Sequence, residues 1–227
     1  VKSSGISVAK LLNQSTPLSH LKTEGACITP NGAMFKSDKP GFLPRLLEKM
    51  YNDRVKYKKL EFQSKQEYQK TKDKNLTKKI ATYHNIQWAK KISLNSAYGA
   101  IGNQYFRYYD VRQATAITTS GQFVIRFIEN KVNEYMNSIL KTHDKVDYVV
   151  ASDTDSIYLT VDKLVDATCK DKSKEHILRF INKVVDTRIQ PFLDKCFAEL
   201  ADYTNAIGNK MVMKREVIAD KGIWTAK

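Results

Sequence analysis

The feature that most constrains the fold of this sequence is a helical pattern that begins at Leu43. Apolar side chains recur there at steps of three and four residues, at Leu43, Leu46, Leu47, Met50 and Tyr51. This spacing places them on one face of a helix, and Pro44 is tolerated in a first turn. The pattern predicts one helix over residues 43–68 and another over 79–98, joined by a polar tip. Two helices joined in this way form an antiparallel helical hairpin.

Extended structure is predicted at four places outside this hairpin. Aromatic residues dominate 104–112, β-branched and aromatic residues form the runs 148–150 and 157–161, and residues 211–219 alternate with period two. The polar stretch from Ser152 to Ser156 separates the two central runs and predicts a β-hairpin. We interpret the aromatic side chains of 104–112 as core packing along a strand.

Two more helical patterns accompany these strands. The first is amphipathic, with an apolar face at Ala116, Phe123, Phe127, Val132, Tyr135, Met136 and Ile139. The second extends over residues 177–200 and contains Pro191, where we expect a kink. Antiparallel strands mixed with helices predict an α+β fold, in which an antiparallel sheet packs with helices and the basic helical hairpin projects from it.

The charge of the chain is strongly basic and unevenly distributed. The net charge is +14, and residues 45–91 hold 14 Lys and Arg against 5 Asp and Glu. The surplus is therefore concentrated in the predicted helical hairpin. Such a surface favours a polyanionic partner, and a solvated lysine-rich helix is the alternative interpretation.

Composition excludes several classes of protein. A chain that is 42% hydrophobic and 27% charged is a folded globular one. We expect no membrane span, because no apolar run reaches about 18 residues, and no secretion signal opens the chain. The three cysteines are far apart and lack paired spacing, which favours a reducing cytoplasm. Dinucleotide-binding, Walker A, zinc-protease and nucleophile-elbow strings do not occur.

The sharpest polar feature is the pair Asp153 and Asp155 at the predicted hairpin tip. Alternation along a strand would place both carboxylates on the same side, where they repel unless a proton or cation lies between them. Mg²⁺ takes oxygen ligands and often uses one or two protein carboxylates together with substrate phosphates. An Asx turn with solvated aspartates is the alternative interpretation.

A second candidate group lies on the helical hairpin. Lys91, Asn95 and Tyr98 are spaced by four and three residues and therefore share one face of the second helix. Arg54 and Lys58 are four residues apart on the first helix. A guanidinium and two ammonium groups suit phosphate, while an amide and a phenol suit a sugar or a base edge. Exposed charged faces without a ligand are the alternative interpretation of each helix taken alone.

Two of these segments together resemble family B, or alpha-like, DNA polymerases. Residues 91–99 match the Lys-x-x-x-Asn-Ser-x-Tyr-Gly motif of that family, and residues 153–156 match its Asp-Thr-Asp-Ser motif. The run 106–110 is similar to polymerases of large tailed bacteriophages. Residues 214–216 and 224–227 resemble the approach to a Lys-Lys-Arg-Tyr-like motif, of which only the first lysine is present.

The resemblance implies a domain organisation and a role for each candidate residue. Residues 43–103 would be the fingers, and residues 1–42 and 104–227 incomplete parts of the palm. Triphosphate-binding residues would be Arg54, Lys58, Lys91 and Asn95, and Tyr98 would line the nascent base pair. Asp155 would be the principal metal ligand, Asp153 its neighbour and Glu216 an accessory carboxylate. Lys227 would touch the primer-template backbone.

The implied activity is template-directed DNA synthesis by nucleotidyl transfer from a dNTP to a primer 3′-hydroxyl, with two Mg²⁺ ions. Fingers closure around a correct pair would select the nucleotide. The implied partners are primer-template DNA and dNTP, together with a sliding clamp and other replication proteins that bind through absent regions. The implied compartment is the cytoplasm, that of the host cell if the source is viral.

One departure from the family pattern is important. The family carries its other metal-binding aspartate in an Asp-x-x-Ser-Leu-Tyr-Pro-Ser motif, and no such string occurs in this sequence. We therefore expect a fragment, or one subunit of a split polymerase, that is inactive alone. The competing hypotheses are a non-catalytic nucleic-acid-binding module, in which aromatic residues 105–109 contact bases, and a two-metal nuclease. Triphosphate binding that depends on Lys91 and Asn95 distinguishes the polymerase from both.

Overall fold

The computed structural model describes residues 25–142, 145–169 and 173–223. The chain divides into two compact units, one formed by Lys36–Ile117 and the other by Val1–Phe35 together with Thr118–Lys227. Its elements combine helices with short antiparallel strands, which confirms the α+β prediction. No helix in the described ranges is both long and apolar enough to cross a membrane.

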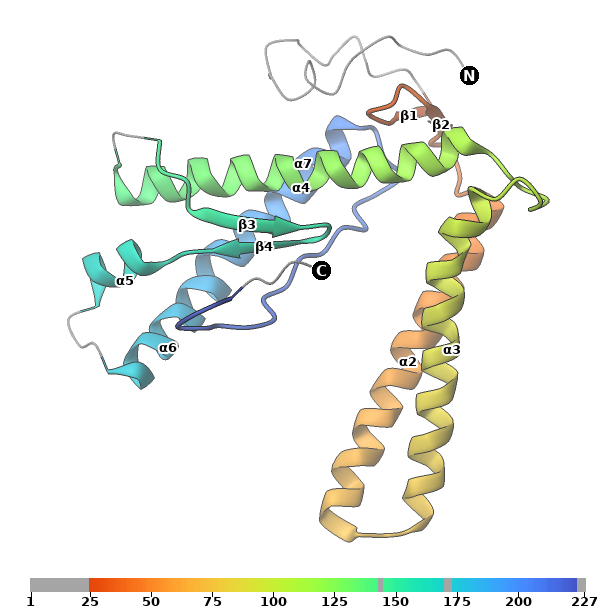
Figure 1. The fold of residues 1–227 in the computed structure, drawn as a ribbon, viewed down its shortest axis with the longest axis horizontal. Helices are drawn as coiled ribbons and strands as arrows, with labels where there is room; N and C mark the ends of the chain where they lie inside the picture. Colours follow the sequence, from red (N-terminus) through yellow and green to blue (C-terminus); the bar gives the residue numbers. More distant parts are fainter. Residues whose placement is uncertain (1–24, 143–144, 170–172, 224–227) are drawn as a thin grey trace. The chain divides into compact units, whose positions relative to one another are not determined.

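The unit Lys36–Ile117 is built around two long helices, α2 (Phe42–Thr71) and α3 (Asn75–Ile101), which lie side by side and antiparallel (Figure 1). Both are longer than the sequence pattern predicts, so the tip between them is shorter. The left-handed Lys72, with φ 55°, ends α2 by donating its N–H to the Tyr68 carbonyl. The Asp73 carboxylate then accepts the N–H of Asn75 at 2.9 Å and opens α3.

Polar contacts join α2 to α3 along much of their length. The side chains of Asp53 and Lys90 form an ion pair at 3.1 Å, and Glu61 lies 3.1 Å from His84. The rings of Tyr57 and Tyr83 are in tilted contact, with centroids 6.0 Å apart. The helices therefore meet through specific polar pairs as well as apolar side chains, and such pairs fix their register.

The prediction of a strand over residues 104–112 is wrong. The chain there forms successive turns, in which Phe106 N–H donates to Asn103 O and Tyr109 N–H donates to Phe106 O, both at 2.9 Å. Asp110 then caps helix α4 (Val111–Leu140), because its carboxylate accepts the N–H of Arg112 at 2.9 Å. Local turn and cap chemistry overrides the β-propensity of the aromatic residues. Core packing is also a wrong interpretation for Tyr105, which is 88% exposed.

The second unit contains α4 from Thr118 onward and a β-hairpin of β3 (Val149–Asp153) and β4 (Ser156–Leu159), as predicted. The core of this unit is formed by α4, β3 and a later helix, through Ile128, Val132, Met136, Tyr148, Val149, Ile189, Leu193, Cys196 and Phe197. The predicted apolar face of α4 is buried at Val132 and Met136, whereas Ile139 is exposed. Burial of this face places one strand of the hairpin against α4.

Three short elements and one long helical segment complete the second unit. A small sheet pairs β1 (Ala26–Ile28) with β2 (Met34–Lys36) around the Pro30–Gly32 turn, and α5 (Asp162–Thr168) follows the β-hairpin. Helices α6 (Lys174–Val184) and α7 (Gln190–Tyr203) are joined by a π-helical turn, Val185–Ile189. The kink expected at Pro191 corresponds to this π-helical turn, which lies just before the proline. A π turn changes the hydrogen-bond pattern of the helix and so accommodates the missing proline N–H.

The final strand predicted over residues 211–219 is not formed. Its alternating side chains include Val212 and Val217, which are exposed. In the described part of the chain, the sheets are the two pairs β1–β2 and β3–β4, so the segment has no neighbouring strand. A β-pattern specifies a strand only where another strand receives its backbone hydrogen bonds.

Candidate functional site

The Asp53–Lys90 ion pair sets the level at which the predicted phosphate-binding residues lie on α2 and α3. Arg54 follows Asp53, and Lys91 follows Lys90. A helix rises about 1.5 Å per residue, so one step from each partner changes the level only slightly. Arg54 and Lys91 therefore lie at nearly the same level of the hairpin.

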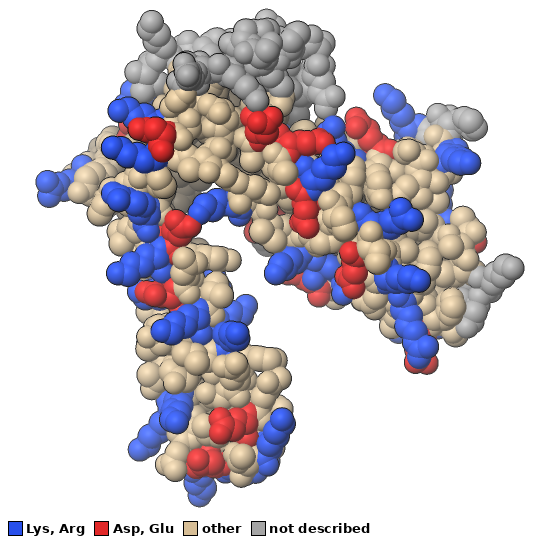
Figure 2. Space-filling model, turned by 180° about the vertical axis from the view of Figure 1, so that it is seen from behind, with Lys and Arg blue, Asp and Glu red and all other residues tan. Residues whose placement is uncertain are grey.

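The same geometry places these residues on one side of the hairpin. Each step along an α-helix rotates the side-chain direction by about 100°. Because the two helices are antiparallel, one step beyond a facing pair rotates the next side chain of both helices toward the same side of the hairpin. When the rotation is counted from the facing pair Asp53 and Lys90, the side chains of all five predicted residues lie on that side. We call it the cationic side, and its residues are Arg54, Lys58, Lys91, Asn95 and Tyr98. Basic residues gather visibly on the hairpin surface (Figure 2).

The cations on this side differ in how they are held. The Nε of Arg54 is buried and has no hydrogen-bond partner within the described residues. Lys58 and Asn95 are exposed. The Nζ of Lys91 lies 4.9 Å from the centre of the Trp88 ring. The side therefore offers guanidinium and ammonium charge, which suits an anionic ligand.

The acidic candidates lie at the tip of the β3–β4 hairpin. Asp153 ends β3 and pairs with Ser156 of β4, and Thr154 adopts a left-handed φ of 50°. The Asp155 N–H donates to the Asp153 carbonyl at 2.5 Å, which closes a three-residue turn. Asp155 therefore belongs to the turn, and the expectation that simple strand alternation aligns both aspartates is wrong. Both residues are exposed.

Asparagines of α4 hold the base of this hairpin. Asn133 Oδ1 accepts the N–H groups of Tyr148 at 2.8 Å and of Val149 at 3.0 Å. Asn137 donates to the Val146 carbonyl at 2.7 Å and accepts the Val146 N–H at 3.0 Å. These residues were not singled out from the sequence, although two asparagines four apart within an apolar helix face are a recognisable signal.

The aspartates of the hairpin fit a hard divalent cation only as a partial ligand set. Across the described ranges, no three His, Cys, Asp or Glu residues form a group that could hold a metal ion. Glu216 is exposed in an irregular segment and does not complete such a group with Asp153 and Asp155. Two neighbouring carboxylates nevertheless match Mg²⁺, which uses few protein ligands when phosphate oxygens supply the others. The predicted contact residue Lys227 lies outside the described residues.

Comparison with known proteins gives a family match over most of the chain. The family model described as DNA polymerase family B matches residues 4–201. Both motif segments, 91–99 and 153–156, lie inside this range.

Three curated relatives show how the similarity is distributed. The DNA-directed DNA polymerase of Escherichia phage RB69 is 32% identical, over 88% of this chain and 28% of the relative. That of Enterobacteria phage T4 is 42% identical, over 66% of this chain and 18% of the relative. A DNA polymerase of Thermococcus sp. (strain 9oN-7) is 33% identical, over 66% of this chain and 17% of the relative. The chain thus spans less than a third of the length of these relatives.

Proposed function

The chain belongs to DNA polymerase family B, and on that premise we propose that it forms fingers and palm portions of a DNA-directed DNA polymerase. The proposed reaction is transfer of a nucleotide from a dNTP to a primer 3′-hydroxyl, directed by a template strand. The observation that carries the proposal is the common cationic side on which the Asp53–Lys90 register gathers Arg54, Lys91 and Asn95. The printed names of the relatives support the reaction class.

In this proposal the cationic side binds the triphosphate. Arg54 donates to a phosphate through the terminal N–H groups of its guanidinium, whose fork geometry suits phosphate oxygens. Lys58 and Lys91 neutralise phosphate charge as ammonium groups. Asn95 donates its amide N–H to the nucleotide, and Tyr98 lines the nascent base pair.

The proposed palm function rests on Asp153 and Asp155. Their carboxylates would hold divalent cations, with Asp155 as the principal ligand and Glu216 as an accessory one. Bound Mg²⁺ would supply charge stabilisation of the transferring phosphoryl group and activation of the primer hydroxyl. The hairpin turn keeps both carboxylates exposed, so that they remain accessible to substrate phosphate.

We further propose that these 227 residues do not extend a primer by themselves. Two carboxylates from one hairpin are a partial set for two cations, and the Asp-x-x-Ser-Leu-Tyr-Pro-Ser string is absent. The proposed partners of the complete enzyme are primer-template DNA, a sliding clamp and other replication proteins. The proposed compartment is a reducing cytoplasm, consistent with the unpaired state of Cys27, Cys169 and Cys196.

A second candidate function is non-catalytic nucleic-acid binding. The exposure of Tyr105 favours it, because an accessible aromatic ring can stack on a base. Arg107 lies over the neighbouring Tyr108 ring at 5.8 Å and adds a cation to the same segment. Binding of nucleic acid without any triphosphate affinity would favour this function over the polymerase.

The test is triphosphate binding by the 227-residue chain, measured by calorimetry with dTTP and Mg²⁺. We expect Lys91→Met to weaken binding about ten-fold or more, because it removes a charged contact to phosphate. Lys78→Met is the matched control, since Lys78 is an exposed lysine of α3 turned by about 220° from Lys91. Equal effects of the two substitutions, or none from either, would refute the proposed triphosphate site.

A further inference from the structure

Lys90 and Lys91 are neighbours in sequence, but their ammonium groups have different contacts. The Lys90 ammonium is paired with the Asp53 carboxylate at 3.1 Å. The Lys91 ammonium lies 4.9 Å from the centre of the Trp88 ring and, within the described ranges, forms no ion pair. A neutral aromatic ring attracts an ammonium group through its quadrupole without neutralising it. Lys91 is therefore held in place with its full charge still available.

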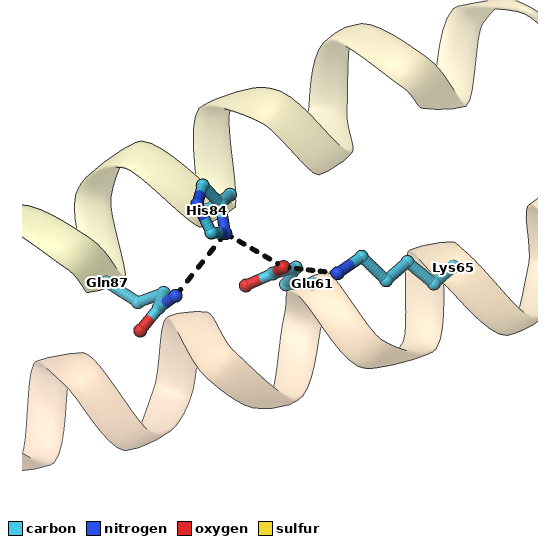
Figure 3. A network of polar contacts seen from close by, with 4 residues as sticks. All are labelled: Glu61, Lys65, His84 and Gln87. Atoms are coloured by element: carbon cyan, nitrogen blue, oxygen red, sulfur yellow. Dashed lines mark hydrogen bonds and ion pairs between the residues drawn. The ribbon is translucent and has the colours of Figure 1, made fainter.

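The Trp88 ring is supported by His84 of the same helix, and His84 in turn contacts α2. His84 stacks on Trp88 with a centroid separation of 6.2 Å and an interplanar angle of 17°. His84 Nδ1 lies 3.1 Å from Glu61 Oε1, and Glu61 also accepts a hydrogen bond from Lys65 at 2.6 Å (Figure 3). Gln87 lies beside this network, with its Nε2 3.5 Å from His84 Nδ1.

Glu61 anchors this network, and its charged side chain is buried. The hydrogen bond from Lys65, followed by that from His84, lowers the pKa of the Glu61 carboxyl despite its burial. A buried carboxylate that satisfies two partners has little freedom to move. Contacts thus lead from α2 through His84 and Trp88 to Lys91.

We propose that Trp88 is a positioning residue for Lys91: its indole ring holds the Lys91 ammonium ready for the nucleotide triphosphate, and His84 and Glu61 hold the ring. This inference rests on the proposed function, since it assigns Lys91 to triphosphate. It adds a residue outside the Lys-x-x-x-Asn-Ser-x-Tyr-Gly segment, three positions before its lysine. Spacing of three residues places Trp88 beside Lys91 on the helix surface.

Preorganisation explains why such a ring would matter. A free lysine side chain samples many rotamers, and ordering it on binding costs free energy. Contact with the indole ring restricts this sampling before the ligand arrives. The expected consequence is tighter triphosphate binding with no contact between Trp88 and the ligand.

The experiment compares dTTP affinities of the 227-residue chain by calorimetry in the presence of Mg²⁺. We expect Trp88→Leu to raise the Kd about two- to five-fold. Trp88→Phe should recover part of this loss, because it retains an aromatic face. In a Lys91→Met background, Trp88→Leu should have no further effect, since the ammonium that the ring holds is gone. Thermal unfolding of every variant reports the structural effect separately.

The outcomes separate this inference from the proposed function. If Lys91→Met leaves the Kd unchanged, the triphosphate role of Lys91 fails, and the inference fails with it. If Lys91→Met weakens binding while Trp88→Leu does not, only the inference fails. It fails as well if Trp88→Leu and Lys91→Met act additively, or if leucine and phenylalanine at position 88 have equal effects.

A spectroscopic measurement tests the contact directly. The chain has two tryptophans, so Trp224→Phe leaves Trp88 as the single indole reporter. Inorganic triphosphate, which is transparent at indole wavelengths, should change the Trp88 emission when it binds the Lys91 ammonium beside the ring. Lys91→Met should abolish this change, and Lys78→Met should preserve it. An emission change that persists in Lys91→Met would overturn the proposed coupling between the two residues.

Discussion

The Asp53 carboxylate lies 3.1 Å from the Lys90 ammonium and joins α2 to α3 one residue away from both Arg54 and Lys91. Without a fixed register, two charged helices could slide or rotate relative to each other. This ion pair brings residues 37 positions apart in sequence into a defined alignment. The alignment of the cationic side therefore depends on a contact between two residues that are not themselves predicted to bind the triphosphate.

Breaking this pair should weaken the hairpin slightly. Both side chains are about one-third exposed, at 32% and 38%, and such ion pairs contribute roughly 0.2 to 1 kcal/mol. We expect Asp53→Asn to lower the free energy of unfolding by that amount in chemical denaturation. The charge-swapped variant, with Asp53→Lys and Lys90→Asp, should recover most of the loss. A swapped variant as unstable as the single one would contradict this role.

Removing Asn133 should destabilise the unit that contains the β3–β4 hairpin. Its side-chain oxygen accepts two backbone N–H groups, and Asn133→Ala leaves both without that acceptor. We expect a loss of about 1 to 3 kcal/mol in the free energy of unfolding. Asn130→Ala is the matched control, because Asn130 is exposed on the same helix. Alanine is a better helix former than asparagine, so Asn130→Ala should cause no loss. An equal loss from both substitutions would contradict the anchoring role of Asn133.

The Asp110 cap should show a low titration midpoint. The Arg112 guanidinium donates to both Asp110 oxygens and, as the main cause, lowers the pKa of that carboxyl to about 2. A depressed pKa stabilises the folded state at pH values above the ordinary carboxyl pKa. This contribution is lost as the pH falls through about 2.

This titration is measured by NMR of the Asp110 carboxyl carbon. Arg112→Gln should move the midpoint upward, toward the ordinary aspartate pKa of 3.8. Arg126→Gln removes another exposed arginine of α4 and should leave the midpoint unchanged. A wild-type midpoint near the ordinary aspartate value would contradict the bonding of Asp110 to Arg112.

Removing the turn carboxylate should abolish primer extension. In the complete polymerase, we expect Asp155→Ala to lose measurable extension while binding of duplex DNA stays largely intact, because the substitution removes a proposed cation ligand and not a DNA contact. Extension and duplex binding are measured on the same preparations. Asp162→Ala is a control at an exposed aspartate that follows the same β-hairpin. Near-normal extension by Asp155→Ala would refute the metal assignment.

Local patterns predicted some elements well for a clear reason. Helix periodicity and the polar tip around residue 73 depend on residues close in sequence, so α2 and α3 could be anticipated. The β3–β4 hairpin is also local, because its strands are joined by two residues, Thr154 and Asp155. Patterns failed where a partner was required or where turn chemistry competed. The alternating residues 211–219 lack a neighbouring strand, and the 104–112 segment is closed by turns before the Asp110 cap.

The sequence alone determined the residue types of the candidate site: cations, an amide and a phenol at helical spacing, and two carboxylates in a short polar turn. Only the tertiary structure decided their alignment, because the Asp53–Lys90 pair and the support of Trp88 by His84 and Glu61 connect residues on two helices. Spacing along one helix specifies a face. Which faces meet is decided by contacts across the hairpin, since their energies depend on side chains that the backbone brings together from distant positions.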